Sequence, residues 1–155
     1  MSRSDIEAFV YREARLMDDM RYDEWLRLWD EHGVYHVPID HNDTGTGLHV
    51  AIIRDDYTRL VQRLDRLKSG SVLAVEGQKG AMRRIVSNIE VDTGSDGIEV
   101  RSNFMLGIAR TAEQQVWIGQ SVHRLRPEGD GFRILRKTVF LINSGQEIPL
   151  LQFLI

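Results

Sequence analysis

Cysteine is absent from this 155-residue chain. Its absence excludes disulfide bonds, thiolate nucleophiles, cysteine-ligated zinc and any cysteine-ligated iron–sulfur cluster on this chain. An excess of positive charge is absent as well, because 20 Lys and Arg are set against 23 Asp and Glu, which leaves a net charge of -3. Nucleic acid is therefore not an expected partner, since binding it requires a clustered basic surface.

Long hydrophobic runs are also missing. Residues 1–15 carry charges throughout and lack the continuous apolar stretch of a signal peptide. No other segment approaches the roughly 20 apolar residues that cross a bilayer, so we expect no membrane association. Hydrophobic residues still make up 42% of the chain, which is enough for a core. We therefore expect a soluble cytoplasmic protein that folds as a single domain over residues 1–155.

The N-terminal region has helical periodicity. Ser4 and Glu7 have the spacing of a capping box at the start of a first helix. A second, shorter helix should follow and stop at Gly33, where glycine favours a left-handed end. The apolar stripes of the two helices consist of Ile6, Phe9, Val10, Ala14 and Met17, then Tyr22, Trp25, Leu26 and Trp29.

The next stretch predicts a strand, a loop and a third helix. Residues 34–37 form a short strand, and residues 40–47 are rich in turn formers. The third helix begins at Asp55 or Asp56 and stops at Gly70. Its apolar stripe consists of Tyr57, Leu60, Val61, Leu64 and Leu67.

The second half of the chain changes to a period of two, which is typical of strands. Four long strands are predicted over residues 83–92, 98–110, 116–126 and 132–143. Short turns between them indicate an antiparallel meander. Helices followed by such a sheet make an α+β fold. Because long strands twist and coil, we expect a four-stranded sheet that curves around the helices and forms a cone with an internal pocket.

Two apolar features point beyond a single chain. The last predicted strand is apolar on both faces, although a sheet with one wet face should alternate. One face would carry Phe132, Ile134, Phe140 and Ile142, and the other Leu135, Val139 and Leu141. Residues 148–155 are also mostly apolar, whereas chain termini are usually polar. We expect this tail and the outer sheet face to be buried in a subunit interface.

Short motifs along nearly the whole chain occur in an order that resembles one protein family. In the N-terminal half they are EARLMD at 13–18, RYDEWL at 21–26 and YHVP at 35–38. In the second half they are RRIVSN at 83–88, VRSNF at 100–104, Gly119 with His123, Leu125 and Arg126, then Ile134, Lys137, Val139, Leu141 and Asn143, and the final FLI. The ordered set resembles the beta (small) subunits of aromatic-ring-hydroxylating dioxygenases, the Rieske non-haem iron oxygenase family.

The resemblance implies a fold and an assembly. The fold is the cystatin-like, nuclear-transport-factor-type cone. The assembly is an α3β3 hexamer in which a trimer of small subunits supports three large (alpha) subunits that oxidise aromatic hydrocarbons. In that family the large subunit carries the Rieske [2Fe–2S] cluster and the mononuclear Fe(II), and electrons come from NAD(P)H through a reductase. No cofactor, metal or catalytic residue is then expected on this chain.

Subunit contacts are expected from two groups of residues. The polar group is Arg83, Arg84, Asn103 and Arg126, because arginine binds carboxylates of a partner with two hydrogen bonds. The alternative for these arginines is an exposed charged edge that discourages strand-to-strand aggregation. The apolar group is Phe153, Leu154 and Ile155.

A rival interpretation is an isomerase or dehydratase with its active site inside the cone. A buried carboxylic acid there would have a raised pKa and could transfer protons near neutral pH. The residues able to line such a pocket are Asp18, Tyr22, Tyr35, His36 and His123. In the structural alternative Asp18 pairs with Arg21, Tyr22 fills the core and His123 is hydrogen-bonded within the sheet. A small-molecule-binding module without a redox partner is the third possibility.

Overall fold

The computed structural model describes residues 2–40, 42, 50–69, 81–94, 97–109, 113–146, 148, 151 and 153–155. In chain order the elements in these ranges are α1 (Arg3–Asp18), α2 (Tyr22–Leu26), β1 (Trp29–Pro38), β2 (Ala51–Asp55), α3 (Tyr57–Ser69), β3 (Met82–Gly94), β4 (Gly97–Ala109), β5 (Gln114–Glu128) and β6 (Gly131–Leu141). The helix stop predicted at Gly70 and most of the loop predicted at 40–47 lie outside the described residues.

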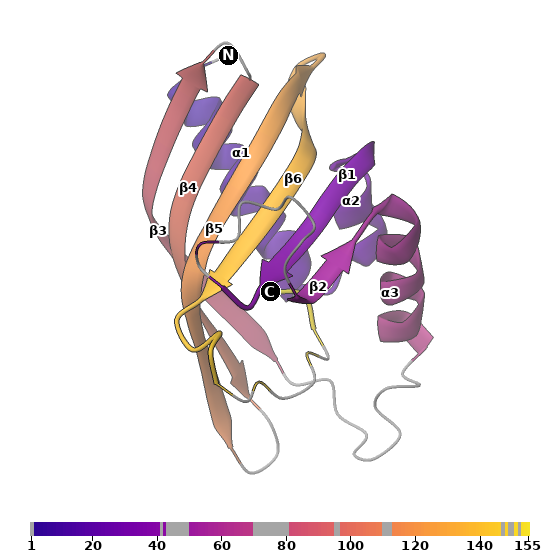
Figure 1. Ribbon diagram of the computed structural model, residues 1–155. Helices are drawn as coiled ribbons and strands as arrows, with labels where there is room; N and C mark the ends of the chain where they lie inside the picture. Colours follow the sequence, from indigo (N-terminus) through magenta and orange to yellow (C-terminus); the bar gives the residue numbers. More distant parts are fainter. Residues whose placement is uncertain are drawn as a thin grey trace.

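All six strands of the described residues belong to one sheet in the order β2-β1-β6-β5-β4-β3. Strands β3 to β6 form the predicted antiparallel meander. Strand β1 extends the sheet by pairing parallel to β6, and β2 pairs antiparallel to β1. The four-stranded prediction is therefore too small, whereas the α+β class is confirmed. Helix α1 lies across one face of the curved sheet, and α3 lies beside β1 and β2 (Figure 1).

Helix α1 begins earlier than predicted. Ser2 is its N-cap: the Asp5 amide donates to Ser2 Oγ at 3.3 Å, and the Ser2 amide donates to Asp5 Oδ2 at 2.7 Å. The capping box predicted for Ser4 and Glu7 is wrong, because Glu7 pairs with Arg3 instead. The predicted apolar stripe is confirmed, since all of its members are buried.

The second helix is shorter than predicted. Helix α2 ends at Leu26, and strand β1 begins at Trp29 because the chain there pairs with β6. The Ile134 amide donates to the Leu28 carbonyl at 2.8 Å. Gly33 is thus a strand residue and not a helix stop. A Cβ at Gly33 would lie 2.8 Å from Trp29 Cε3 and 3.0 Å from the Ile134 carbonyl oxygen, so glycine permits this close approach.

Strand β2 was not predicted, since five residues next to a turn-rich segment carry little pattern. Helix α3 lies where it was predicted, and Asp56 caps it by accepting a hydrogen bond from the Arg59 amide at 2.9 Å. Leu60, Leu64 and Leu67 from its predicted stripe are buried.

A bulge in β6 corrects the predicted strand faces. Arg124 of β5 pairs with Arg136, and the next residue, Leu125, pairs with Ile134, so Leu135 is the extra residue. The bulge places Phe132 and Ile134 on the same inner face as Val139 and Leu141. Assigning them to opposite faces was wrong, because a strict period of two does not survive an inserted residue.

The C-terminal tail packs against this chain's own core. Leu151, Phe153, Leu154 and Ile155 are all buried, and the ring of Phe153 contacts that of Trp117 edge to face at 5.6 Å. The apolar character of the tail therefore has an explanation within one chain, and the contact expected between it and a partner subunit loses its basis.

Candidate functional site in the interior of the cone

Helix α1 places two acidic side chains between itself and the sheet. Glu13 lies on the buried stripe, one helical turn from Phe9 and Met17, and is 2% exposed. Asp18 follows at the end of the helix and is also buried. Because buried carboxylates need partners, the residues that the sheet presents to them decide the chemistry of the interior.

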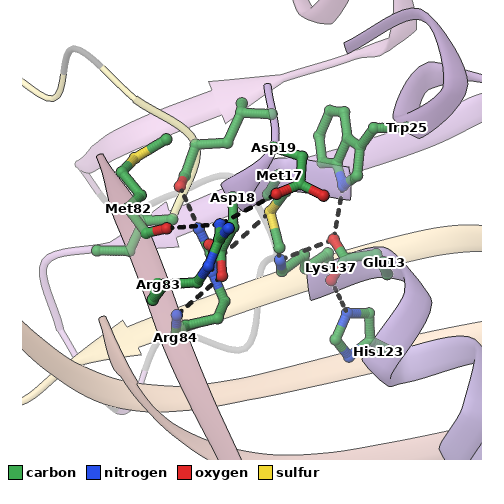
Figure 2. A network of polar contacts seen from close by, with 12 residues as sticks. Glu13, Met17, Asp18, Asp19, Trp25, Met82, Arg83, Arg84, His123 and Lys137 are labelled. Atoms are coloured by element: carbon green, nitrogen blue, oxygen red, sulfur yellow. Dashed lines mark hydrogen bonds and ion pairs between the residues drawn. The ribbon is translucent and has the colours of Figure 1, made fainter. Parts of the chain in front are cut away.

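Glu13 is the centre of a buried polar cluster. Its Oε1 accepts from Lys137 Nζ of β6 at 2.9 Å and from Trp25 Nε1 of α2 at 2.7 Å. Its Oε2 lies 3.7 Å from His123 Nε2 of β5. Figure 2 shows the three side chains converging on this one carboxylate. The cluster joins α1 and α2 to two central strands of the sheet.

Burial and charge act in opposite directions on this cluster. Burial alone would raise the pKa of Glu13, but the Lys137 ammonium and His123 outweigh it and hold that pKa well below its usual value. Burial lowers the pKa of His123, which Glu13 only partly opposes. Burial also lowers the pKa of Lys137, because the interior disfavours the charged ammonium. Glu13 is thus held as a carboxylate and is no proton donor near neutral pH.

A second buried pair lies on the other side of Met17. Arg84 of β3 donates from its backbone amide to Asp18 Oδ2 at 2.8 Å and from Nε to Asp18 Oδ1 at 2.7 Å. Its Nη2 donates to the Leu154 carbonyl at 3.0 Å. Arg84 therefore links the C-terminal tail to β3 and, through Asp18, to α1. The Arg84 side chain is 3% exposed, so the contact with a partner predicted for it has no accessible surface. Asp18 also does not pair with Arg21, which instead binds Glu24.

The residues predicted for an internal active site are not brought together. The Tyr35 hydroxyl donates to the Ile155 carbonyl at 2.6 Å and accepts from the Ile155 amide at 3.0 Å. Burial raises the pKa of the Tyr35 hydroxyl above its ordinary value. His36 follows Tyr35 on β1 and therefore points to the opposite face. Tyr22 is a buried core residue, as the structural alternative expected.

Around Glu13, the described residues fill the interior almost completely. The space enclosed beside Glu13, His123 and Lys137, with Ser102 and Ser121 in its wall, is about 10 Å³. Such a volume holds about one water molecule, whereas ligand pockets reach several hundred Å³. Asp18 borders a surface hollow of about 300 Å³, but Arg84 engages both of its carboxylate oxygens. Among the described residues, the protein's own side chains thus occupy the space beside Glu13 and His123 where a pocket was predicted.

Metal binding finds no support in the part of the chain that the structure describes. No group of three His, Asp or Glu side chains gathers there in a way that could hold an ion. A Rieske cluster requires cysteine ligands, which the sequence lacks altogether. In the same described residues, no helix has the length and apolarity needed to cross a membrane.

Three of the predicted contact residues do lie on the surface. Arg83 is 78% exposed and its Nη1 donates to Asp19 at 3.0 Å. Arg126 is 48% exposed and its Nη2 donates to Asp30 at 2.7 Å. Asn103 is exposed on β4. These three side chains remain available to a partner.

The family model described as a ring hydroxylating beta subunit matches residues 12–146 of this chain. The chain belongs to this family. The beta subunits are non-catalytic members of dioxygenase complexes, which are oxidoreductases, and the small space found beside Glu13 agrees with that role. The sequence resemblance is thereby confirmed, and the stand-alone pocket enzyme is not supported.

Individual relatives agree with this assignment. The beta subunit is 30% identical over 146 residues to the anthranilate 1,2-dioxygenase small subunit of Acinetobacter baylyi, a match that covers 90% of this chain and 88% of that one. It superposes on the crystal structure of the benzoate 1,2-dioxygenase beta subunit of Burkholderia mallei with a TM-score of 0.78 and 27% identity, with 93% of each chain covered. An NTF2-like protein with a cystatin-like fold from Novosphingobium aromaticivorans, at 17% identity and a TM-score of 0.59 over 91% of this chain and 82% of that one, confirms the predicted fold.

Proposed function

We propose that this beta subunit acts as a rigid base for the large subunit of an aromatic-ring-hydroxylating dioxygenase, with three copies of each chain in an α3β3 hexamer. The observation that carries the proposal is the match to the ring hydroxylating beta subunit family over residues 12–146. The described interior supports it, because the Glu13–Lys137 pair and its neighbours leave a space of only about 10 Å³ beside α1. We infer that this chain serves the reaction by holding another chain.

The redox chemistry then belongs to the partner. The large subunit would carry the Rieske [2Fe–2S] cluster and the mononuclear Fe(II), and a reductase would deliver electrons from NAD(P)H. The beta subunit contributes by fixing how neighbouring large subunits face one another. The buried pairs that fasten α1 to β3 and β6 make such a base stiff, because they cannot be displaced without leaving a buried charge unpaired. The absence of a membrane-spanning helix among the described residues is compatible with a place in the cytoplasm.

The contacts with the large subunit should involve Arg83, Asn103 and Arg126. Arg83 has most of its guanidinium in solvent and uses Nη1 for Asp19 and the Met82 carbonyl. Its remaining donors fit a carboxylate of the partner. Exchange of either arginine for glutamate should weaken binding of the large subunit and leave the fold unchanged.

Co-purification tests this proposal. The beta subunit should be tagged and purified from its own host, and the product examined by native mass spectrometry with iron analysis. The expected result is a complex with a larger iron-carrying chain in equal numbers, three of each. Purification of this chain alone and free of iron, under conditions in which the larger chain is expressed, would overturn it.

A further inference from the structure

The inner face of the sheet, which α1 covers, carries a buried polar patch; the opposite face is the outer face. Ser102 of β4 pairs with Ser121 of β5, and two residues along β5 His123 pairs with Lys137 of β6. Their exposed fractions are 2%, 6%, 1% and 1%. Since residues two apart on a strand share a face, the four side chains, called the polar patch below, point to the same side. They meet Glu13 of α1 around one small cavity.

His123 is the member of the polar patch whose hydrogen bonds are incomplete. Neither of its ring nitrogens has a hydrogen-bond partner among the described residues. Its Nε2 faces Glu13 Oε2 at 3.7 Å, as Figure 2 shows, and this distance is longer than a hydrogen bond. Burying a polar atom without a partner is unfavourable, and in folded proteins such atoms commonly bond to an ordered water molecule. The ring of His123 therefore needs a partner that the described side chains do not supply.

The cavity beside the patch has the size and the wall that such a partner requires. Its volume is about 10 Å³, which is close to what one water molecule needs. Ser102, Ser121 and His123 all contribute to its wall. A buried water makes two to four hydrogen bonds, and two hydroxyl groups and one ring nitrogen provide that number.

The charges around the cavity favour a water molecule over an ion. Lys137 lies in the wall but is paired with Glu13 at 2.9 Å, and Arg84 lies in the wall but is paired with Asp18 at 2.7 Å. Each charge is therefore balanced within the chain, and no net charge remains to attract an ion. A hard cation such as Ca²⁺ would also need about six oxygen ligands, for which a cavity of this size has no room.

We propose that one ordered water molecule occupies this cavity, donates a hydrogen bond to His123 Nδ1 and is held by the hydroxyls of Ser102 and Ser121. The position of Glu13 assigns the two ring nitrogens: its carboxylate faces Nε2, so Nε2 carries the proton and Nδ1 is the acceptor. Burial lowers the pKa of His123, which keeps the ring neutral and leaves it one acceptor nitrogen. The water belongs to the single chain and completes the hydrogen bonds between α1 and the inner face.

A crystal structure of the beta subunit tests the water site directly. Density for one water molecule is expected within about 3.2 Å of His123 Nδ1 and of at least one of the two serine hydroxyls. Crystals soaked separately in bromide and in rubidium should show no anomalous signal in the cavity. An empty cavity, or an anomalous peak from either ion, would overturn the proposal.

Nuclear magnetic resonance of the ring nitrogens tests the same site in solution. In long-range proton–nitrogen spectra of the folded protein above pH 7, His123 should show a single tautomer with the proton on Nε2 and an acceptor at Nδ1. His32, whose side chain is 87% exposed, is the reference within the same spectrum and should show both tautomers in exchange. A proton on Nδ1 of His123 would contradict the proposed hydrogen bond.

A matched pair of substitutions displaces the water. Ser102→Val places methyl groups in the cavity and should remove the water density, shift the Nδ1 resonance of His123 and lower the midpoint of thermal unfolding by about 3–6 °C, because Nδ1 loses its partner. Ser87→Val makes the same change at an exposed position of β3 and should move the midpoint by less than about 2 °C. An unshifted His123 resonance in a folded Ser102→Val variant would count against the water. Should that variant fail to fold, the two measurements on the wild type decide.

The water site and the proposed function can fail separately. An empty cavity in a chain that still co-purifies with the iron-carrying large subunit would overturn the water site alone. A beta subunit that holds the water but is purified without any large subunit would overturn the proposed function alone.

Discussion

On the inner face of the sheet Lys137 and His123 are each 1% exposed, whereas on the outer face Ile85 and Ile142 are each 68% exposed. Charged side chains are usually exposed and large apolar side chains are usually buried, so both faces of this sheet depart from the usual distribution. The interior charges have partners within the chain, since Glu13 binds Lys137 and Asp18 binds Arg84. The outer apolar side chains remain in solvent in the single chain.

The difference teaches that the two faces need different explanations. Polar groups inside a cone are costly, and they persist here because every charge is placed against its opposite. Apolar side chains on a wet face gain no burial in the single chain, and a contiguous set of them is typical of a contact surface. Predictions on the interior therefore concern the free energy of unfolding of this chain.

The largest effect should come from breaking the interior pair. Lys137→Met removes the ammonium and leaves the Glu13 carboxylate buried with only Trp25 and His123 beside it. The free energy of unfolding should fall by about 3–5 kcal/mol, which is the usual cost of an uncompensated buried charge. Urea denaturation followed by circular dichroism measures this loss.

The control removes both charges. In the double variant Glu13→Gln with Lys137→Met, the glutamine carbonyl can still accept from Trp25 Nε1, and no charge is left unpaired. Most of the lost free energy of unfolding should return, because apolar replacement of a whole buried pair is often close to neutral. A double variant that is less stable than Lys137→Met alone would show that the Glu13–Lys137 pair stabilises the fold by more than the cancellation of two buried charges.

A smaller effect should come from substituting two glycines, one on each face of the sheet. A Cβ at Gly119 on the inner side would lie 2.4 Å from the Phe140 carbonyl oxygen and 3.0 Å from the Phe104 ring. At Gly107 on the outer side, a Cβ would lie 3.8 Å from the Arg83 carbonyl oxygen, which is an ordinary van der Waals contact. Gly119→Ala should cost about 1–3 kcal/mol of unfolding free energy through overpacking, and Gly107→Ala less than about 0.5 kcal/mol. Equal losses in thermal unfolding would contradict the difference between the faces.

Much of the sheet was predictable from the sequence because alternation is a local signal. The strand predicted over residues 98–110 is found as β4, and its alternating residues Val100, Phe104 and Leu106 are buried. The faces of β6 were not predictable in this way, since the bulge at Leu135 depends on pairing with β5. The end of α2 was missed for a similar reason: pairing of Trp29 with Ile134 overrides the helical pattern, and a partner strand more than 100 residues away leaves no trace in local periodicity.

The interior cluster left a sequence signal that was not used. Glu13 falls on the apolar stripe of α1, and Lys137 falls in step with Val139 and Leu141 on β6. One acidic and one basic residue at core positions of two periodic segments predict a buried pair. What the sequence could not supply is which charges meet. Arg84 was expected at a subunit contact because arginine binds carboxylates with two hydrogen bonds. The carboxylate that it binds belongs to Asp18 of the same chain, 66 residues away.

The smallest effect should appear as a dependence of stability on pH near neutrality. Burial lowers the pKa of His123 below 6.5, so the folded protein keeps it neutral where the unfolded chain takes up a proton. Stability contributed in this way is present above pH 6.5 and is lost as the pH falls toward the folded pKa, with less than about 1 kcal/mol lost by pH 6. The lowered pKa of Glu13 acts in the same direction, but only below its ordinary value of 4.5. His123→Gln should therefore flatten the loss between pH 7 and pH 6, whereas His32→Gln, at a side chain that is 87% exposed, should leave it unchanged. An unaltered slope in His123→Gln, measured by urea denaturation at both pH values, would mean that His123 is charged inside the cone and that the interior holds one more positive charge than its acids balance.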